Sequence, residues 1–184
     1  MNEYGTHYPV LSEILKKFKM KNVLEFGTGF FSTGLFVKKC KSVLSIEMQY
    51  VDWFDKVKEK YFEEIESGIL SIKCIVGDSG VDAIKYLEDN HSDQKFDMVF
   101  VDGAGGSRYN CANYAKTITD TIICHDTEYP GYGWENIVVD GEWVWLDVKI
   151  YDTWTSVMTK RKDIIDYINT FDYMKLRDTY KDVS

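Results

Sequence analysis

Short apolar runs alternate with stretches of helical periodicity from residue 11 to residue 124. Apolar residues recur at helical spacing in a leading segment that contains Leu11, Ile14 and Phe18. The apolar runs predict strands at 23–26, 42–46, 70–76, 98–101 and 121–124. The stretches between them predict helices at about 32–40, 54–65, 81–87 and 108–116, the third opened by a capping box of Ser79 and Asp82. Strands that alternate with helices are typical of a parallel sheet in an α/β fold.

The pattern changes to strict alternation after Trp143. Apolar residues fall at every second position from Val144 to Ile150, which predicts a half-buried strand with its other face turned outward. Residues 152–153 turn the chain, residues 155–159 return as a partner strand, and a last helix is predicted around Ile164 to Phe171. The whole chain, 1–184, is therefore predicted to be a single α/β domain: a doubly wound, mostly parallel sheet with an antiparallel C-terminal hairpin.

Composition and charge narrow the classes of function. A hydrophobic fraction of 45% predicts a compact globule, and the formal net charge of −8 disfavours nucleic acid or an anionic membrane surface as a partner. No apolar run is long enough to span a membrane, and no signal peptide precedes residue 20. The four cysteines follow no metal-ligand spacing, so we expect free thiols and a cytoplasmic protein.

The segment from Val23 to Thr33 joins a predicted strand, a glycine turn and a predicted helix. Gly27 and Gly29 allow a ligand to approach the backbone, and Glu47, twenty residues after Gly27, ends the next strand, where an acid can bind a ribose diol. Glu25 lies inside the end of the first strand, where it would repel a pyrophosphate. It suits a cofactor with a cationic amino acid end and no phosphate, and S-adenosylmethionine is such a cofactor.

The ordered set of motifs resembles the class I S-adenosylmethionine-dependent methyltransferases. The motifs are Val23-Leu-Glu-Phe-Gly-Thr-Gly29, Ser45-Ile-Glu-Met48, Gly77-Asp-Ser79, Phe96-Asp-Met-Val-Phe-Val-Asp-Gly103 and Cys124-His-Asp-Thr-Glu128. Trp53, the Val-Asp-Gly strand end and the His-Asp-Thr sequence are similar to the small methyltransferase domain 24 type. The resemblance covers residues 20–160 and implies a Rossmann-like fold with S-adenosylmethionine as the cofactor.

Ten residues are predicted to bind the cofactor: Glu25, Gly27, Thr28, Gly29, Ser32, Glu47, Met48, Asp78, Ser79 and Asp102. Two of these have an equally simple structural explanation, since Ser79 can cap a helix and Met48 can fill the core. The turn also departs from the resembled pattern, because Phe31 stands where a third small residue is usual. Phe30 and Phe31 leave little space for a cofactor unless both rings point into the core.

The catalytic candidates are Asp102, His125 and Asp126, at the ends of two neighbouring predicted strands. His125 can serve as a general base that takes a proton from a hydroxyl as the methyl group arrives. Alternatively, Asp102 and Asp126 can hold a divalent cation, as in some members of the resembled family. A purely structural role for all three stays open.

The sequence therefore predicts S-adenosylmethionine-dependent methyl transfer to a small-molecule acceptor, with oxygen as the preferred acceptor atom. Residues 1–20, 103–111 and 127–143 are expected to recognise the acceptor, and the oligomeric state is not predicted. One alternative is a methyltransferase-like protein that binds without catalysing, which Phe30 and Phe31 motivate. The other is a NAD-type oxidoreductase, which is weaker because the turn lacks its third glycine and no Tyr-x-x-x-Lys pair occurs.

Overall fold

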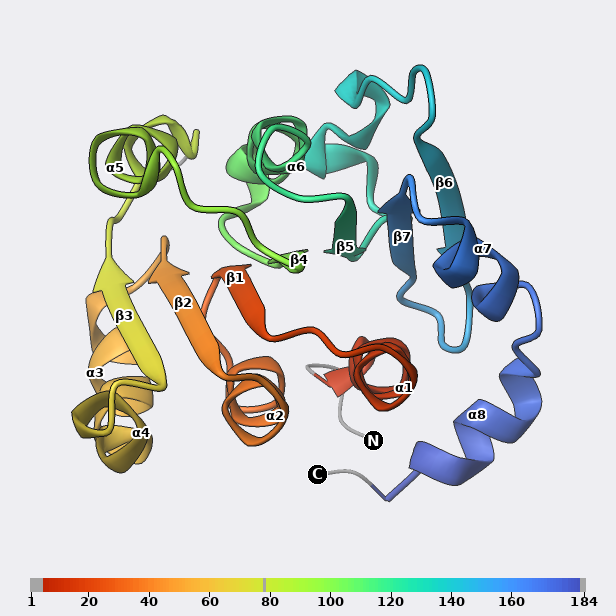
Figure 1. Cartoon of the computed structure of the whole chain (residues 1–184), viewed down its shortest axis with the longest axis horizontal. Coiled ribbons are helices and arrows are strands. Elements are labelled where there is room, and N and C mark those ends of the chain that lie inside the picture. The colour runs from red at the N-terminus through yellow and green to blue at the C-terminus, as the bar shows by residue number, and fades with distance from the viewer. Residues whose placement is uncertain (1–4, 78, 183–184) are drawn as a thin grey trace.

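The computed structural model describes residues 5–77 and 79–182. Within these residues the strands form a seven-stranded sheet in the order β3-β2-β1-β4-β5-β7-β6 (Figure 1). The strands are β1 (Asn22–Phe26), β2 (Ser42–Glu47), β3 (Leu70–Cys74), β4 (Met98–Val101), β5 (Thr121–His125), β6 (Val144–Val148) and β7 (Thr155–Thr159). The first five are parallel, and β7 runs antiparallel to both β5 and β6, so the predicted fold class is confirmed.

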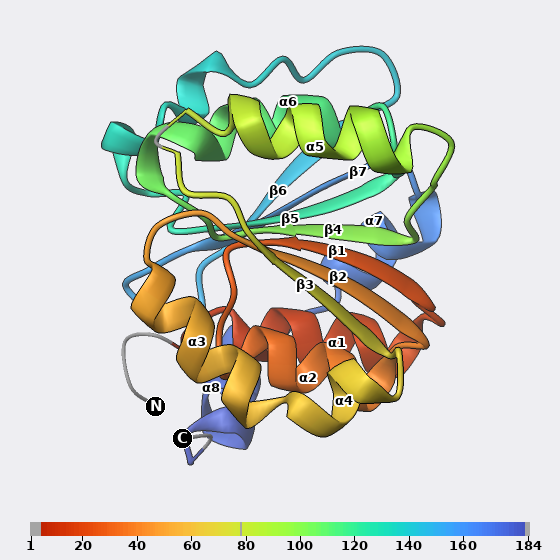
Figure 2. The same cartoon turned by 90° about the vertical axis from the view of Figure 1, so that its left-hand side faces the viewer.

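Helices cover both faces of the sheet. They are α1 (Tyr8–Lys17), α2 (Ser32–Lys39), α3 (Val51–Lys60), α4 (Phe62–Glu66), α5 (Val81–His91), α6 (Arg108–Ala115), α7 (Lys162–Ile168) and α8 (Tyr173–Tyr180). Figure 2 shows α1 to α4 beneath the sheet and α5 and α6 above it. Each face has its own apolar core, with Phe36 and Phe100 on the α1–α4 side and Phe26 and Val101 on the α5–α6 side. The central strands are apolar throughout because both of their faces are buried.

The chain order places a crevice between the ends of β1 and β4. From β1 the chain runs outward to β2 and β3 and then returns to β4 on the other side of β1. Ligands of open α/β sheets bind at such a reversal, outside the carboxyl ends of the strands. Gly27 directly follows β1 with a φ of +89°, and a Cβ on it would lie 2.4 Å from the carbonyl oxygen of Asp102. A glycine is therefore required for the two strand ends to lie this close.

Two helix predictions were wrong in detail. The predicted helix at 54–65 is divided into α3 and α4 at Tyr61, whose hydroxyl donates a hydrogen bond to the Phe30 carbonyl (2.9 Å). The predicted capping box does not form, because the N-cap of α5 is Gly80, with a φ of +75°. A Cβ on Gly80 would lie 2.9 Å from Ser107 Cβ, so close packing against the start of α6 determines where α5 begins.

The C-terminal hairpin forms as predicted, and Asp147 and Lys149 on its second face are exposed, but the two tryptophans of that face are not turned to solvent. Trp143 is only 8% exposed, and the ring of Trp145 lies 6.2 Å from that of Trp134, a residue of the short helix η4 (Trp134–Asn136). The aromatic positions of the alternating pattern therefore belong to the α5–α6 core. The helix α8 was not predicted; Asp172 caps it by accepting from the Lys175 amide (3.0 Å). No helix in the described part of the chain is long and apolar enough to cross a membrane.

Candidate active site

A cavity of about 910 Å³ opens at the carboxyl edge of the sheet. Its lining includes the glycine turn, residues 28–32, and residues at the ends of β4 and β5. Asp102, His125 and Asp126, the predicted catalytic residues, line it together with His7, Arg108 and Tyr132. The structure thus brings the predicted catalytic residues to the same space as Thr28, Gly29 and Ser32.

Arg108, the first residue of α6, holds the two aspartates. Its Nη1 lies 3.0 Å from Asp102 Oδ1 and 3.1 Å from Asp126 Oδ2, and the guanidinium also donates to the carbonyls of Gly103 and His125. Burial opposes ionisation of Asp102, but the charges of His125 and Arg108 outweigh it and hold the pKa of this carboxyl well below its usual range. The guanidinium lies where a cation shared by Asp102 and Asp126 would have to lie. This arrangement argues against the predicted divalent cation.

Both ring nitrogens of His125 are engaged. Nδ1 lies 3.2 Å from Asp102 Oδ1, and Nε2 lies 2.7 Å from the Thr6 hydroxyl and 3.4 Å from Asp126 Oδ1. Burial lowers the pKa of the ring, but Asp102 and Asp126 outweigh this effect and raise it above the ordinary histidine value. A ring whose two nitrogens are both engaged leaves no position for the proton of an acceptor hydroxyl. The geometry therefore argues against the predicted role of His125 as a general base.

Asp126 has a strained backbone. Its φ is +55°, the only positive value for a residue other than glycine in the described chain. The turn is fixed by Arg108 on the side chain and by Trp134, whose indole donates to the Asp126 carbonyl (3.1 Å). Strain of this kind is found at sites where surrounding contacts hold a residue in place. Here the contacts of Arg108 and Trp134 hold Asp126 at the end of β5.

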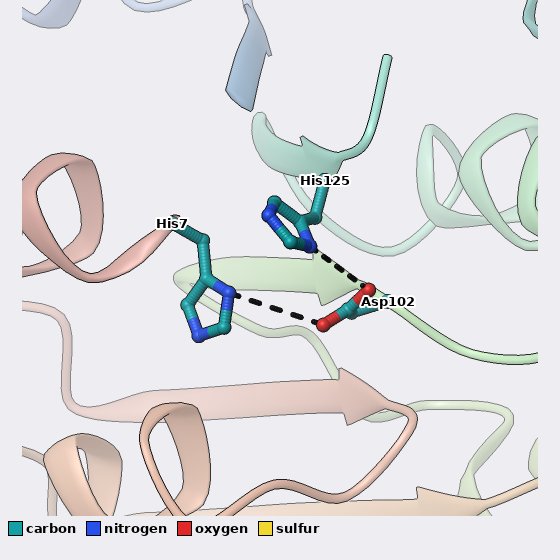
Figure 3. Close-up of side chains that lie close together, drawn as sticks. All are labelled: His7, Asp102 and His125. Atoms are coloured by element: carbon teal, nitrogen blue, oxygen red, sulfur yellow. Dashed lines mark hydrogen bonds and ion pairs between the residues drawn. The ribbon is translucent and has the colours of Figure 1, made fainter. Parts of the chain in front are cut away.

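His7 lies just before α1, and its ring points toward the Asp102 carboxylate (Figure 3). The ring is 2% exposed, and its Nδ1 lies 3.9 Å from Asp102 Oδ2. Neither of its nitrogens has a hydrogen-bond partner in the described chain. Burial, with the charge of His125 as a second cause, lowers the pKa of His7 to about 3, so the ring is neutral.

A metal could in principle be held by a different group of residues. Ligand atoms of His7, Asp102 and His125 all lie within 4.8 Å of one another. The same Asp102 carboxylate already pairs with the Arg108 guanidinium at 3.0 Å. A divalent ion there would face a buried positive charge, which makes the cluster a poor cation site.

Two buried carboxylates, both predicted to bind the cofactor, lie next to the glycine turn. Glu47 is 2% exposed and accepts from the Thr28 hydroxyl (2.6 Å), the Thr28 amide (3.2 Å) and the amides of Gln49 (2.8 Å) and Tyr50 (3.2 Å). Glu25 is fully buried and accepts from the hydroxyls of Thr33 (2.6 Å) and Ser45. Its other oxygen, Oε1, has no hydrogen-bond partner in the described chain, and burial raises its pKa to about 7.

Glu25 gives a prediction for stability. Because its folded pKa is raised from 4.5 to about 7, the folded protein binds the extra proton, and stability falls as the pH rises through this interval. The loss is about 3 kcal/mol at 1.36 kcal/mol per pKa unit. Glu25→Gln is expected to remove this slope in urea unfolding measured from pH 4.5 to 7.5. Glu59→Gln, an exposed residue of α3, serves as the control, and an unchanged slope in Glu25→Gln would contradict the prediction.

The aromatic pair of the turn does not enter the core. The Phe30 ring packs on Trp53, with ring centroids 4.6 Å apart, and the Trp53 indole donates to the Thr28 carbonyl (2.8 Å). Phe30 and Phe31 both line the cavity. A Cβ on Gly29 would meet only the Ser32 hydroxyl, at 2.9 Å. The rings therefore form part of the cavity wall beside the glycine turn.

Five of the predicted cofactor residues that the structure describes do not line this cavity: Glu25, Gly27, Glu47, Met48 and Ser79. Met48 is 1% exposed and packs in the core, close to Gly103, so its placement favours packing over an adenine contact. Ser79 is exposed, and its hydroxyl lies 3.5 Å from the Val81 amide. Asp78 lies outside the described residues.

The sequence alone missed the roles of Arg108 and Thr6. The sequence predicts Arg108 in a helix and in the 103–111 segment that is expected to recognise the acceptor, but not its ion pairs with the two aspartates. No sequence signal marks Thr6. Its contact with His125 joins residues 119 positions apart and depends on how α1 packs.

The fold is similar to that of solved methyltransferases. TomG from Streptomyces achromogenes, an O-methyltransferase involved in tomaymycin synthesis and solved with S-adenosylmethionine, has a TM-score of 0.63 at 16% identity, over 84% of this chain and 78% of that chain. An O-methyltransferase from Bacillus cereus, solved with S-adenosylhomocysteine, has a TM-score of 0.63 at 16% identity, over 84% and 80%. A methyltransferase from Geobacter sulfurreducens has a TM-score of 0.58 at 12% identity, over 86% and 79%.

Likeness at these identities shows the fold alone. No protein-family model matches the sequence, and no curated protein is similar to it in sequence. The resemblance to the methyltransferase domain 24 type therefore stays a prediction.

Proposed function

We propose that this protein is a methyltransferase that uses S-adenosylmethionine and transfers the methyl group to an oxygen atom of a small-molecule acceptor. The observation that carries the proposal is a pair of buried carboxylates behind the glycine turn: Glu47 accepts from the hydroxyl of Thr28, which lines the cavity, and Glu25 accepts from the hydroxyl of Thr33. The similar structures that hold S-adenosylmethionine or S-adenosylhomocysteine support the cofactor, and their O-methyltransferase activity supports the acceptor atom.

The residues present suit this cofactor. The Glu25 oxygen without a partner is a buried acceptor that an ammonium group can satisfy. Glu47 suits the ribose hydroxyls, and rotation of the Thr28 hydroxyl away from it frees an acceptor position. A pyrophosphate would find no cationic side chain beside Glu25 in the described chain and would be repelled by its ionised form, which disfavours NAD. When bound, S-adenosylmethionine supplies an electrophilic methyl group.

The rest of the chemistry is positioning. Arg108 fixes Asp102 and Asp126, and His125 is locked between them, so this part of the cavity wall is rigid. An acceptor held against these residues shares the cavity with the glycine turn, where the cofactor is proposed to bind. Correct alignment and exclusion of water then supply much of the rate.

Glu47→Gln tests the cofactor assignment. The amide keeps an oxygen for the Gln49 and Tyr50 amides but loses the charge, so S-adenosylmethionine binding is expected to weaken by about 1.5–3 kcal/mol in calorimetry. The matched control is Asp97→Asn, because Asp97 also accepts two backbone amides, those of Lys21 (2.7 Å) and Asn22 (2.9 Å), before β4 begins. Equal affinity of the wild type and Glu47→Gln would refute this role for Glu47.

A protein that binds the cofactor without catalysis is the second candidate. Phe30 and Phe31 line the cavity and narrow the space beside the glycine turn. Calorimetry with S-adenosylmethionine and with NAD, followed by a search for S-adenosylhomocysteine release with a panel of acceptors, separates the candidates. Binding without release favours the second candidate, and preferential binding of NAD contradicts both.

A further inference from the structure

We call the part of the cavity lined by His7, Asp102, Arg108, His125 and Asp126 the catalytic wall. His7 differs from the other four residues in its hydrogen bonding. Asp102, Arg108, His125 and Asp126 each pair with others of this group, but neither His7 nitrogen has a hydrogen-bond partner among the residues that the structure describes. The ring is 2% exposed and lines the cavity. A buried polar group without a hydrogen-bond partner raises the free energy of the folded protein. A ligand that forms a hydrogen bond with this ring removes that cost.

The position of His7 is fixed by its neighbours. The preceding residue, Thr6, shares a hydrogen bond with His125 Nε2 (2.7 Å) and accepts another from the Thr153 hydroxyl (2.7 Å). The imidazole packs edge-on to the His125 ring, with centroids 4.7 Å apart, and lies 5.0 Å from the Phe100 ring. Figure 3 shows the His7 ring beside the His125 ring, each directed toward a different oxygen of the Asp102 carboxylate. The unpartnered nitrogens are therefore presented by an ordered segment.

We propose that His7 is the catalytic proton acceptor of this site and that the acceptor it serves is a neutral aromatic hydroxyl. The proposal rests on the proposed function, since it concerns the same methyl transfer. It assigns the base to the segment before α1 and not to the strand ends, where the sequence predicted it.

The proposed step balances with the groups already named. The hydroxyl oxygen forms a bond to the methyl carbon, the carbon–sulfur bond breaks, and its electron pair stays on the sulfur of S-adenosylhomocysteine. The hydroxyl proton passes to a His7 nitrogen. The imidazolium so formed faces Asp102, whose Oδ2 lies 3.9 Å from His7 Nδ1. A weakly basic ring is sufficient, because an oxygen that is gaining a methyl group becomes strongly acidic.

The choice of an aromatic, neutral acceptor follows from the cavity wall. Aromatic residues line the cavity, among them Phe30, Phe31 and Trp53 at or beside the glycine turn, and Tyr132 beside Arg108. Tyr132 is itself stacked on the Arg108 guanidinium, 4.1 Å from the ring centroid. The two aspartates are balanced by Arg108 and by His125, so neither an anionic nor a cationic acceptor is favoured.

Binding tests the proposal with phenol as the probe. Nitrogen NMR of the histidine rings is recorded on the full chain saturated with S-adenosylhomocysteine. Phenol is expected to shift the His7 resonances and to leave those of His91, on α5, unchanged. His7→Leu is expected to weaken phenol binding at least tenfold. Phenol that binds without affecting His7, or that does not bind, would overturn the proposal.

Turnover provides the second test. His7→Gln keeps a polar side chain but cannot accept a proton, and it is expected to lower S-adenosylhomocysteine formation from S-adenosylmethionine and phenol by at least about 100-fold. His91→Gln is the matched control and should not change the rate. No methylation of phenol by the wild type, or full activity of His7→Gln, would overturn the proposal. Absence of cofactor binding in both proteins is a separate result that contradicts the proposed function.

Two measurements distinguish a proton acceptor from a residue that only packs. His7→Leu removes the unpartnered nitrogens and is expected to raise the melting temperature by about 2–4 °C, the shift that 1 kcal/mol gives in a chain of this size. The wild-type rate is expected to stay level as the pH falls from 7.5 to 5, because His125, Asp102 and Arg108 surround a ring that stays neutral there. A lower melting temperature in His7→Leu, or a wild-type rate that falls near pH 6.5, would overturn the proposal.

Discussion

Replacement of Arg108 by methionine is expected to lower the free energy of unfolding by about 3–5 kcal/mol at pH 7, the cost of removing one partner from a buried ion pair. The guanidinium is almost fully buried and lies about 3 Å from both Asp102 and Asp126. Methionine fills a similar volume but leaves two neighbouring carboxylates without their shared cation. Urea unfolding followed by circular dichroism measures the difference.

The pH and a second substitution test the cause of this loss. The pKa of Asp102 is depressed in the folded state, so its pairing stabilises the protein above the ordinary aspartate pKa of about 3.9 and is lost as the pH falls below it. The cost of Arg108→Met should therefore shrink at pH 3. Asp126→Asn in the Arg108→Met background should restore part of the stability. Arg161→Met, which breaks an exposed pair with Asp163 (2.7 Å), is the control and should cost less than about 1 kcal/mol.

Gly27→Ala is expected to have the other large effect, a destabilisation of roughly 4 kcal/mol or more, the range reached by substitutions that strain a special backbone position. The φ of +89° already disfavours alanine. The new methyl group would also lie 2.4 Å and 2.6 Å from the carbonyl oxygen and carbon of Asp102 and 2.8 Å from the Gly103 Cα. All three contacts are to backbone, which cannot rotate away, so the ends of β1 and β4 would have to separate.

Gly29→Ala is the matched comparison two residues further along the turn. Its Cβ would meet only the Ser32 hydroxyl (2.9 Å), a side chain that can rotate. We expect a folded protein by circular dichroism and thermal unfolding, with weaker S-adenosylmethionine binding in calorimetry. Equal stability of the two alanine variants would show that the contact of Gly27 with Asp102 does not limit the fold.

The fold class was predictable because its signals are local. The residues of β4 are apolar without interruption, as a strand covered on both faces must be, and the spacing of short strands and helices predicts a parallel sheet. The predicted ends of elements were less accurate where distant residues decide them. The start of α5 depends on the contact of Gly80 with Ser107, and no residue near Ser79 reveals that contact.

The candidate site divides in the same way. Glu25, Gly27 and Glu47 belong to motifs that can be read within one strand–turn–helix–strand unit. The catalytic wall cannot be read in this way, because its residues come from four separate parts of the chain that meet only in the folded protein. These are the segment before α1, the end of β4, the start of α6 and the end of β5. The sequence places Asp102 and His125 at neighbouring strand ends. It does not indicate that Arg108 already supplies the positive charge between the aspartates.

The contact between Gly27 and Asp102 joins the two sides of the cavity mechanically. The Asp102 amide donates to the Phe26 carbonyl (2.8 Å), and the Gly27 amide donates to the Ile46 carbonyl (2.8 Å), so the glycine turn, β2 and the end of β4 are held as one body. A ligand that shifts the turn also displaces the carboxylate that orients Arg108 and His125. Thermodynamic linkage then requires that a ligand beside the glycine turn and a ligand beside Asp102 change each other's affinity by the same factor. The size of that factor measures how strongly this one contact couples the two parts of the cavity.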